Sequence, residues 1–191
     1  MSLILFIFRD DRFLLTIGDY RKPLVTLWST HDYTNLLNWQ DESPPSSSYI
    51  NCFAWNPMRA NEFVLGCSNN LIRFCTIIET TNETQHVRLQ INHGQIPSSL
   101  NEQLKKPCEI TACTYLISSM NLVICATNFG FITCWNTRTN TCLLHWKADA
   151  NEICFMTAIK HKLITGSSTG CLRLWNIEHL EMNLAQGKDN L

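Results

Sequence analysis

The sequence predicts an all-β fold of the β-propeller type, with about four four-stranded antiparallel blades that form a partial ring within residues 1–191. Three observations predict this fold. A strand–turn–strand hairpin recurs along the chain, the copies are spaced by about one blade length, and a further strand pattern lies before and after each hairpin. Repeats of roughly 40 to 50 residues are typical of such blades.

The hairpin is clearest in KLITGSSTGCLRLWN, residues 162–176. Its GSSTG loop has the glycines of a phosphate-binding loop, which would be followed by a helix and a Lys-Ser/Thr pair. Here Leu172 and Leu174 instead alternate with Arg173 and Trp175, and this period of two is typical of a strand. GSSTG is therefore predicted to be a hairpin turn.

The same hairpin occurs in three further places. LITGSSTGCLRLW aligns without gaps with VICATNFGFITCW and FVLGCSNNLIRFC, and a looser copy with a longer turn is FLLTIGDYRKPLVTLW. The turn residue is Gly170, Gly130 or Asn70, and both residue types tolerate the positive φ that a tight hairpin requires. The structural repeat positions at which the copies end are Trp28, Cys75, Trp135 and Trp175.

Strand patterns around the hairpins complete the blades, which we place at about 1–40, 49–91, 109–148 and 152–186. LILFIF near the start is an inner or residual strand of the first blade. The other inner strands are predicted at 49–55, 109–117 and 152–160, and the outer strands are predicted to start at residues 34, 86, 141 and 179. Asn56-Pro57 ends the second inner strand, as proline requires.

Two stretches interrupt the regular spacing. DESPPSSS, residues 41–48, is predicted to be a loop because of its proline and serine content. Residues 92–106 are predicted to be an insertion, which explains the long interval between the second and third hairpins. This insertion is either a mobile surface loop or carries a short helix near residues 100–106.

The composition excludes several classes of protein. With 45% hydrophobic and 16% charged residues the chain can bury a substantial core, so global disorder is excluded. The net charge of -1 provides no general attraction for nucleic acid or acidic membranes. LILFIF is too short to cross a membrane or to act as a secretion signal. We therefore expect neither nucleic acid nor membrane as a partner.

Ten cysteines are present, without the paired spacing of a disulfide framework. Six of them lie inside predicted strands, where a reduced thiol behaves as a small hydrophobic side chain: Cys67, Cys75, Cys113, Cys125, Cys134 and Cys154. We therefore expect a reducing, cytoplasmic location. No CxxC pair or Cys/His cluster has the spacing of zinc ligands, so we expect no metal and no cofactor.

The segments SSTGCLRLWN and NFGFITCWNTRTNTCLLHW resemble the signature of the WD40-repeat family, and the resemblance extends over residues 10–186. That family commonly ties each blade together with a hydrogen-bond network of His, Ser/Thr, Asp and Trp. This chain lacks the His, and Thr169, Phe129 and Asn69 stand where the turn Asp is usual. Each buried indole N–H must therefore find another partner.

The order of the repeats also resembles a narrower group, the WD40 proteins of centrioles and cilia, with the echinoderm-microtubule-associated-protein-like group as relatives. This resemblance implies a cytoskeletal setting in the microtubule wall of centrioles or axonemes and a role in cilium assembly. It also implies tubulin or other centriolar and axonemal proteins as partners.

The sequence bears on three classes of function. The leading one is a non-catalytic protein-interaction scaffold, with contacts at the hairpin turns through Tyr20, Arg21, Lys22 and Phe129, although Phe129 could equally pack on the neighbouring blade. The second is a general adaptor outside the cytoskeleton, such as a substrate receptor of a modifying complex. The third, an enzyme, is not expected: there is no G-x-S-x-G motif, the six histidines lack ligand spacing, and no catalytic residue stands out.

The number of blades raises a physical problem. The resemblance implies a ring of seven, and a propeller protects its strand edges by closing the ring. Four blades leave an apolar side open on the first blade and on the last. The chain is therefore expected to be a fragment of a longer polypeptide, or to complete its ring with a partner or as a dimer.

Overall fold

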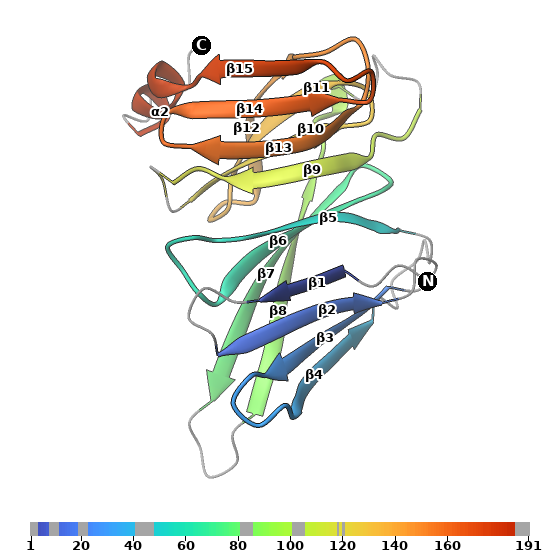
Figure 1. Cartoon of the computed structure of the whole chain (residues 1–191), viewed down its shortest axis with the longest axis vertical. Helices are drawn as coiled ribbons and strands as arrows, with labels where there is room; N and C mark the ends of the chain where they lie inside the picture. The colour runs from blue at the N-terminus through green and yellow to red at the C-terminus, as the bar shows by residue number, and fades with distance from the viewer. Residues whose placement is uncertain are drawn as a thin grey trace.

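The computed structural model describes residues 4–7, 12–18, 23–40, 48–80, 86–100, 106–117, 119 and 121–185. These residues form four antiparallel sheets that follow one another in sequence order and lie side by side (Figure 1). The sheets of the described part form no closed ring. The predicted all-β partial propeller is therefore confirmed.

The strands of each sheet are neighbours in sequence order. The first sheet contains β1 (Ile4–Ile7), β2 (Phe13–Gly18), β3 (Leu24–Ser29) and β4 (Asn35–Gln40). The second contains β5 (Ile50–Trp55), β6 (Glu62–Cys67), β7 (Leu71–Thr80) and β8 (His86–Gln95). The third contains β9 (Ile110–Tyr115), β10 (Leu122–Thr127), β11 (Phe131–Asn136) and β12 (Thr141–Lys147). The fourth contains β13 (Ile153–Ile159), β14 (Lys162–Ser167) and β15 (Leu172–Asn176), and helix α2 (Glu178–Ala185) follows it.

The predicted outer strand from residue 179 is wrong, because this segment is helix α2. The side-chain oxygen of Asn176 accepts a hydrogen bond from the backbone N–H of Glu178 at 3.2 Å, as a residue before a helix commonly does. Ile177 is buried and Leu180 packs against the same apolar cluster, while Glu181 reaches His161 at 2.6 Å. Packing of one side of the segment therefore outweighs its strand-like alternation.

The predicted insertion 92–106 begins later than expected. Strand β8 continues to Gln95 and stays paired with β7 as far as Leu71 opposite Gln95. Residues 98–100 are helical, and residues 101–105 lie outside the described residues. The second sheet therefore has two ten-residue strands that are longer than those of the other sheets.

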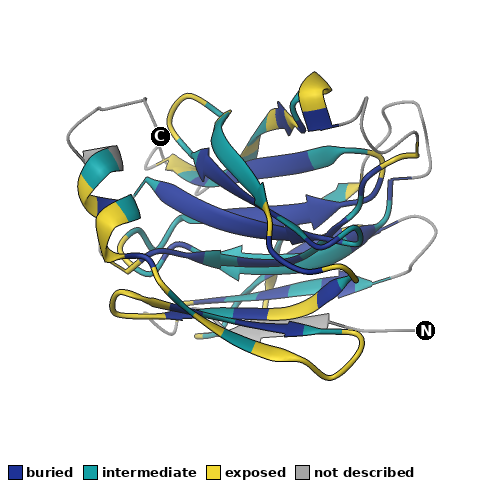
Figure 2. Cartoon of the chain, turned by 90° about the horizontal axis from the view of Figure 1, so that it is seen from above, coloured by how far each residue is buried: buried dark blue, intermediate teal, exposed yellow. Residues whose placement is uncertain are grey.

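Three apolar clusters hold the four sheets together, one between each pair of neighbours. The two faces of one strand belong to different clusters. Ile132 and Cys134 of β11 face the fourth sheet, whereas the next residue, Trp135, faces the second sheet. Figure 2 shows the buried residues along the strands and the exposed ones mainly at turns and on α2. Each inner sheet is therefore buried on both faces.

The four strand-end positions occupy equivalent places in their sheets. Each lies opposite the second residue of the preceding strand, in the pairs Leu14–Trp28, Phe63–Cys75, Val123–Trp135 and Leu163–Trp175. In the hairpin turns, Gly130 and Gly170 have φ of 70° and 81°. The repeats seen in the sequence thus match in backbone register.

The indole N–H groups of the three strand-end tryptophans use threonine hydroxyls as partners. Trp28 donates to Thr16 and Trp175 donates to Thr165, each at 3.0 Å between neighbouring strands. Trp135 donates instead to Thr133 on its own strand at 2.8 Å. The Trp–Thr part of the expected network is therefore present in three sheets without the histidine.

The third strand of two sheets is also tied to the chain segment that enters its sheet. The buried Arg73 of β7 donates to the hydroxyl of Ser48 at 2.7 Å, just before β5. Arg173 of β15 forms an ion pair with the buried carboxylate of Asp149, just before β13. Each arginine therefore links the third strand of its sheet to the segment before the first strand.

All ten cysteines are free thiols. Burial raises the pKa of Cys134 and Cys142 to about 12, so both stay protonated. Cys154 differs from the expectation of a buried side chain, because it is exposed on β13, as is Cys171 before β15. Among the described residues, no helix is long and apolar enough to span a membrane.

Candidate functional site

The sheets present two ends with different connections. At one end each hairpin turn lies beside a segment that enters a sheet. The Asn128 N–H donates to the Glu109 carbonyl, in the segment that enters the same sheet, and the Asn70 N–H donates to the Cys108 carbonyl, in the segment that enters the next sheet. The opposite end carries the turns between first and second strands and between third and fourth strands, including residues 56–61 and 137–140.

Of the contact residues predicted from sequence, the structure describes Phe129, which lies in the hairpin turn between β10 and β11. Tyr20, Arg21 and Lys22 lie outside the described residues. Phe129 is half-buried and packs against the cluster between the second and third sheets, and its carbonyl accepts a hydrogen bond from Lys147. Phe129 thus packs into the core between the second and third sheets, and a partner contact by any of the four stays a prediction.

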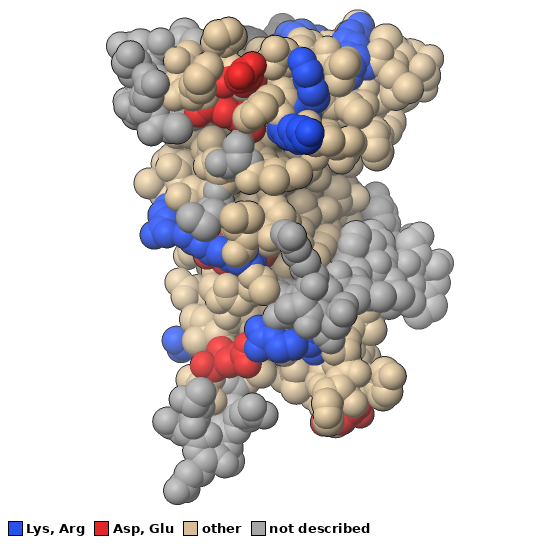
Figure 3. Space-filling view, turned by 60° about the vertical axis from the view of Figure 1, so that its left-hand side comes forward, with Lys and Arg blue, Asp and Glu red and all other residues tan. Residues whose placement is uncertain are grey.

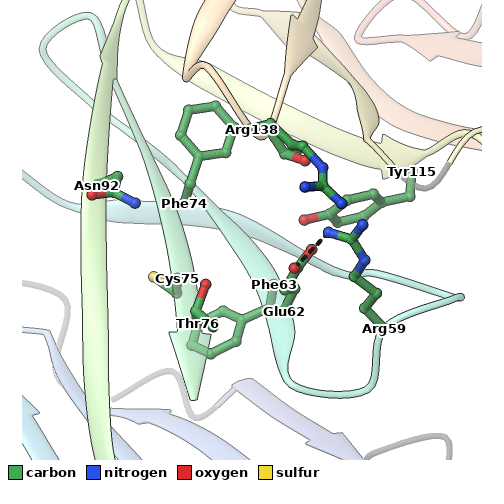
Figure 4. Close-up of a pocket in the computed structure, with 10 residues that line it drawn as sticks. Arg59, Glu62, Phe63, Phe74, Cys75, Thr76, Asn92, Tyr115 and Arg138 are labelled. Atoms are coloured by element: carbon green, nitrogen blue, oxygen red, sulfur yellow. Dashed lines mark hydrogen bonds and ion pairs between the residues drawn. The ribbon is translucent and has the colours of Figure 1, made fainter. Parts of the chain in front are cut away.

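One cavity lies at the opposite end, at the junction of the second and third sheets (Figure 4). Its volume is about 280 Å³. Tyr115 lies beside the charged side chains of Arg59 and Arg138, whereas Phe74 and Asn92 lie on the other side of the cavity (Figure 4). The lining residues are Arg59, Glu62, Phe63, Phe74, Cys75, Thr76, Asn92, Tyr115, Thr137 and Arg138.

Asn56 organises the turn that carries Arg59. Its side-chain oxygen accepts hydrogen bonds from the backbone N–H groups of Met58 at 3.0 Å and Arg59 at 3.3 Å, and its amide group donates to Glu62 at 3.0 Å. Glu62 in turn pairs with Arg59 at 2.8 Å. The Arg59 guanidinium is thereby held at the edge of the cavity.

Asn136 organises the second basic turn in the same way. Its side-chain oxygen accepts from the backbone N–H of Arg138 at 2.8 Å and of Thr139 at 3.3 Å. The Arg138 side chain donates through Nε to Asn121 at 3.1 Å, which fixes the plane of the guanidinium. The asparagine that follows the strand-end tryptophan therefore shapes the turn that presents Arg138.

Tyr115 lies at the end of β9, on the same side of the cavity as the two guanidinium groups (Figure 4). Burial, together with the nearby Glu62 carboxylate, raises the pKa of Tyr115 well above its usual value. Its hydroxyl therefore stays protonated and can donate a hydrogen bond. The buried hydroxyl of Thr137 has no hydrogen-bond partner among the described residues.

These groups suit a partner with hydrogen-bond acceptors. Two arginines and one glutamate leave one net positive charge at the cavity, and the Phe63 and Phe74 rings supply apolar surface. Arginine presents several N–H donors that match a carboxylate. Basic and acidic side chains are otherwise interspersed on the face in Figure 3, in line with the net charge of -1.

A larger hollow of about 780 Å³ lies at the same end between the first and second sheets. The Arg12–Glu79 ion pair, 3.2 Å long, crosses its border. Both side chains are exposed, and such pairs contribute little to stability. Its lining includes Arg12 and Thr80, which in the sequence stand next to residues outside the described part of the chain.

Sequence reasoning missed Arg59, Tyr115 and Arg138, because they belong to turns and a strand end of two different sheets. One signal could have found them: Asn followed two or three residues later by Arg, after a strand-end tryptophan, in WNPMR and WNTR. Both asparagines start a side-chain-capped turn that ends in an arginine at the cavity.

Comparison with known proteins gives the same family that the repeats resemble. The chain is 31% identical over 167 residues to WD repeat-containing protein 90 of Xenopus tropicalis, which covers 87% of this chain and 8% of that protein. It is 32% identical over 168 residues to WD repeat-containing protein 90 of Mus musculus, covering 88% and 8%. The chain thus spans less than a tenth of the length of these relatives.

The structural comparison confirms the fold. The β-propeller domain of Cps50 (Swd1) from Myceliophteria thermophila superposes with a TM-score of 0.63 at 15% identity, covering 90% of this chain and 52% of that chain. No protein-family profile matches the chain. The resemblance to WD40 repeats is confirmed by the relatives and by this propeller, and it supports a protein-interaction scaffold.

Proposed function

We propose that this chain, a partial WD40 β-propeller, is a non-catalytic interaction scaffold that acts on the microtubule-based structures of centrioles and cilia and contributes to cilium assembly. The observation that carries the proposal is its similarity to WD repeat-containing protein 90 over 87% of its length. The cellular setting is what the resemblance to centriolar and ciliary WD40 proteins implies, with tubulin or other centriolar or axonemal proteins as partners.

We place a partner contact at the cavity between the second and third sheets. Arg138 there has its Nε bonded to Asn121, and its guanidinium faces the same space as the protonated hydroxyl of Tyr115. A segment with an acidic side chain next to an apolar one would match the donors and the aromatic rings together. A second proposed contact consists of the residues predicted from sequence: Tyr20, Arg21, Lys22 and Phe129.

The alternative is a general adaptor outside the cytoskeleton. The two functions differ in location, so the tagged chain should be expressed in ciliated cells and imaged with a centriole marker. Enrichment at centrioles or axonemes supports the proposal, whereas a uniform distribution favours the adaptor. Co-sedimentation with purified microtubules then tests for direct contact with tubulin.

The contact is tested with Arg138→Glu, which reverses the charge at the cavity. Loss of one charge-assisted contact of about 1 to 2 kcal/mol lowers binding about five- to thirtyfold. Arg88→Glu is the matched control, because Arg88 is an exposed arginine of β8 that does not line the cavity. Equal centriolar enrichment of both variants and the unmodified chain would remove the cavity as the contact site.

We also propose that further blades, from a partner or from a second copy of the chain, complete the open ring.

A further inference from the structure

We propose that the outer face of the fourth sheet is a docking surface for the first sheet of a second copy of this chain, so that copies associate tail to head. The inference rests on the scaffold function proposed above, for which it names one partner and the surfaces that join. It depends on the arrangement of the sheets and not on the cellular setting.

The outer face of the fourth sheet carries large apolar side chains in solvent. Leu172 is 74% exposed, Leu174 67%, Phe155 52% and Ile159 54%. Phe155 lies opposite Gly166, which lies opposite Leu172, so these residues form one row across all three strands. Leu174 lies in the next row on the same face, opposite Ile164. Contiguous apolar surface of this kind marks an interaction site.

The equivalent positions in the third sheet show what covers such a face. Ile132 and Cys134 of β11 correspond to Leu172 and Leu174 of β15 in the repeat, and both are fully buried by the fourth sheet. In the second sheet, Ile72 is buried in the same way by the third. Every sheet that is followed by another has this face covered by a sheet, so the expected occupant at the fourth is also a sheet.

At each interface, the sheet that covers the preceding one does so with a second set of residues that recurs in the repeat. In the fourth sheet, Leu163 and Trp175 pack against the third sheet, with Thr165 bound to the indole. Another residue of this interface, Trp146 of β12, has its ring centroid 6.4 Å from that of Trp175 in an edge-on arrangement. A sheet with these residues at these positions is therefore shaped to cover the preceding one.

The first sheet has the same set on the side that faces away from the second sheet, where Leu14, Thr16 and Trp28 are half-buried. Leu14, Thr16 and Trp28 alternate with Phe13, Leu15 and Leu27, which face the second sheet, so they point the other way. The Trp28–Thr16 bond of 3.0 Å matches the Trp175–Thr165 bond in length and register. No preceding sheet covers this side among the described residues.

One copy thus has an exposed apolar face on its fourth sheet. On its first sheet it has a face with the residues that cover such a face at the other interfaces. The two faces differ, so the contact is head-to-tail, and such contacts close into a ring or continue as a chain of subunits. Two copies with four blades each would reach the upper end of the usual four to eight blades per propeller. A dimer that closes as one ring is therefore the expected assembly.

The test measures the mass of the purified chain by analytical ultracentrifugation over a range of concentrations. We expect a concentration-dependent dimer with twice the chain mass of 22.0 kDa. The tail variant Leu172→Asp/Leu174→Asp and the head variant Leu14→Asp should each stop ring closure and weaken dimerisation at least tenfold. Met58→Asp is the matched control, because Met58 is also exposed but lies in the turn before β6, and it should dimerise normally.

Mixing separates this contact from non-specific association. An equal mixture of tail and head variants retains one intact interface between unlike chains, so it should form a 1:1 complex more readily than either variant alone. Circular dichroism confirms that each variant is folded. A chain that is monomeric at all concentrations, or variants that dimerise as well as the unmodified chain, would overturn the proposal and assign the face to a further blade or to another protein. Such a result leaves the centriolar scaffold untouched, since localisation is scored separately.

Discussion

Replacing Trp135 with alanine should destabilise the fold far more than replacing Trp28, although the two residues occupy the same repeat position. Trp135 is fully buried, its ring lies 6.1 Å from that of Phe74, and its N–H is bound to Thr133. Truncating such a residue lowers the free energy of unfolding by about 3 to 5 kcal/mol. Trp28 also has a hydrogen bond, to Thr16, but no preceding sheet lies over its ring among the described residues. Replacing Trp28 with alanine should therefore lower the free energy of unfolding by only about 1 to 2 kcal/mol.

The assay is urea denaturation followed by far-ultraviolet circular dichroism, because removing a tryptophan changes the fluorescence signal itself. Protein concentrations at which the chain is monomeric are required, since a docked copy would cover Trp28. Thr133→Val is the control that removes the hydrogen-bond acceptor and leaves the ring in place, and it should cost about 1 kcal/mol. If Trp28→Ala costs as much as Trp135→Ala in the monomer, the reasoning from covered and uncovered faces is refuted.

Two further predictions use pairs of equivalent or similar residues. Gly130→Ala should lower the free energy of unfolding by about 2 to 4 kcal/mol and Gly170→Ala by about 1 kcal/mol, measured by the same denaturation. Both glycines have positive φ, but only at Gly130 would the new Cβ meet the backbone of the segment that enters the next sheet. A thiol reagent should modify Cys154 and Cys171 rapidly in the native chain, because both are exposed. The other eight cysteines should react only on unfolding, even in mildly alkaline buffer, because burial raises the pKa of thiols such as Cys134 to about 12. Mass spectrometry of the labelled peptides checks the order, and early labelling of Cys134 would mean that the third sheet opens.

The hairpins could be predicted from sequence because their determinants are local. Alternating side chains and a glycine or asparagine in the turn specify a strand, its partner and the register, as in LITGSSTGCLRLW. The recurrence of that pattern then predicts the fold class, since one supersecondary unit repeated at a blade length cannot bury its apolar faces alone.

The boundary errors have a tertiary cause. HLEMNLA reads as a strand by alternation, yet Ile177 and Leu180 find apolar contacts only as a helix turned onto the fourth sheet. Likewise β8 extends beyond the predicted strand because β7 offers ten residues for it to pair with. Neither contact is visible from the local pattern.

The candidate site was hidden from sequence for a similar reason. Arg59, Tyr115 and Arg138 are far apart in the chain, and only the packing of the second sheet on the third brings them to one cavity.

By itself the sequence determined the strands, the turns and the repeat that makes this chain a partial propeller, because these depend on neighbouring residues. The tertiary structure alone decided which copy of each repeated residue is buried. Leu172 and Ile132 stand at the same place in the repeat, but one is in solvent and the other in a core. Burial depends on whether another sheet lies over that face, and this is a property of the stack of sheets and not of the repeat.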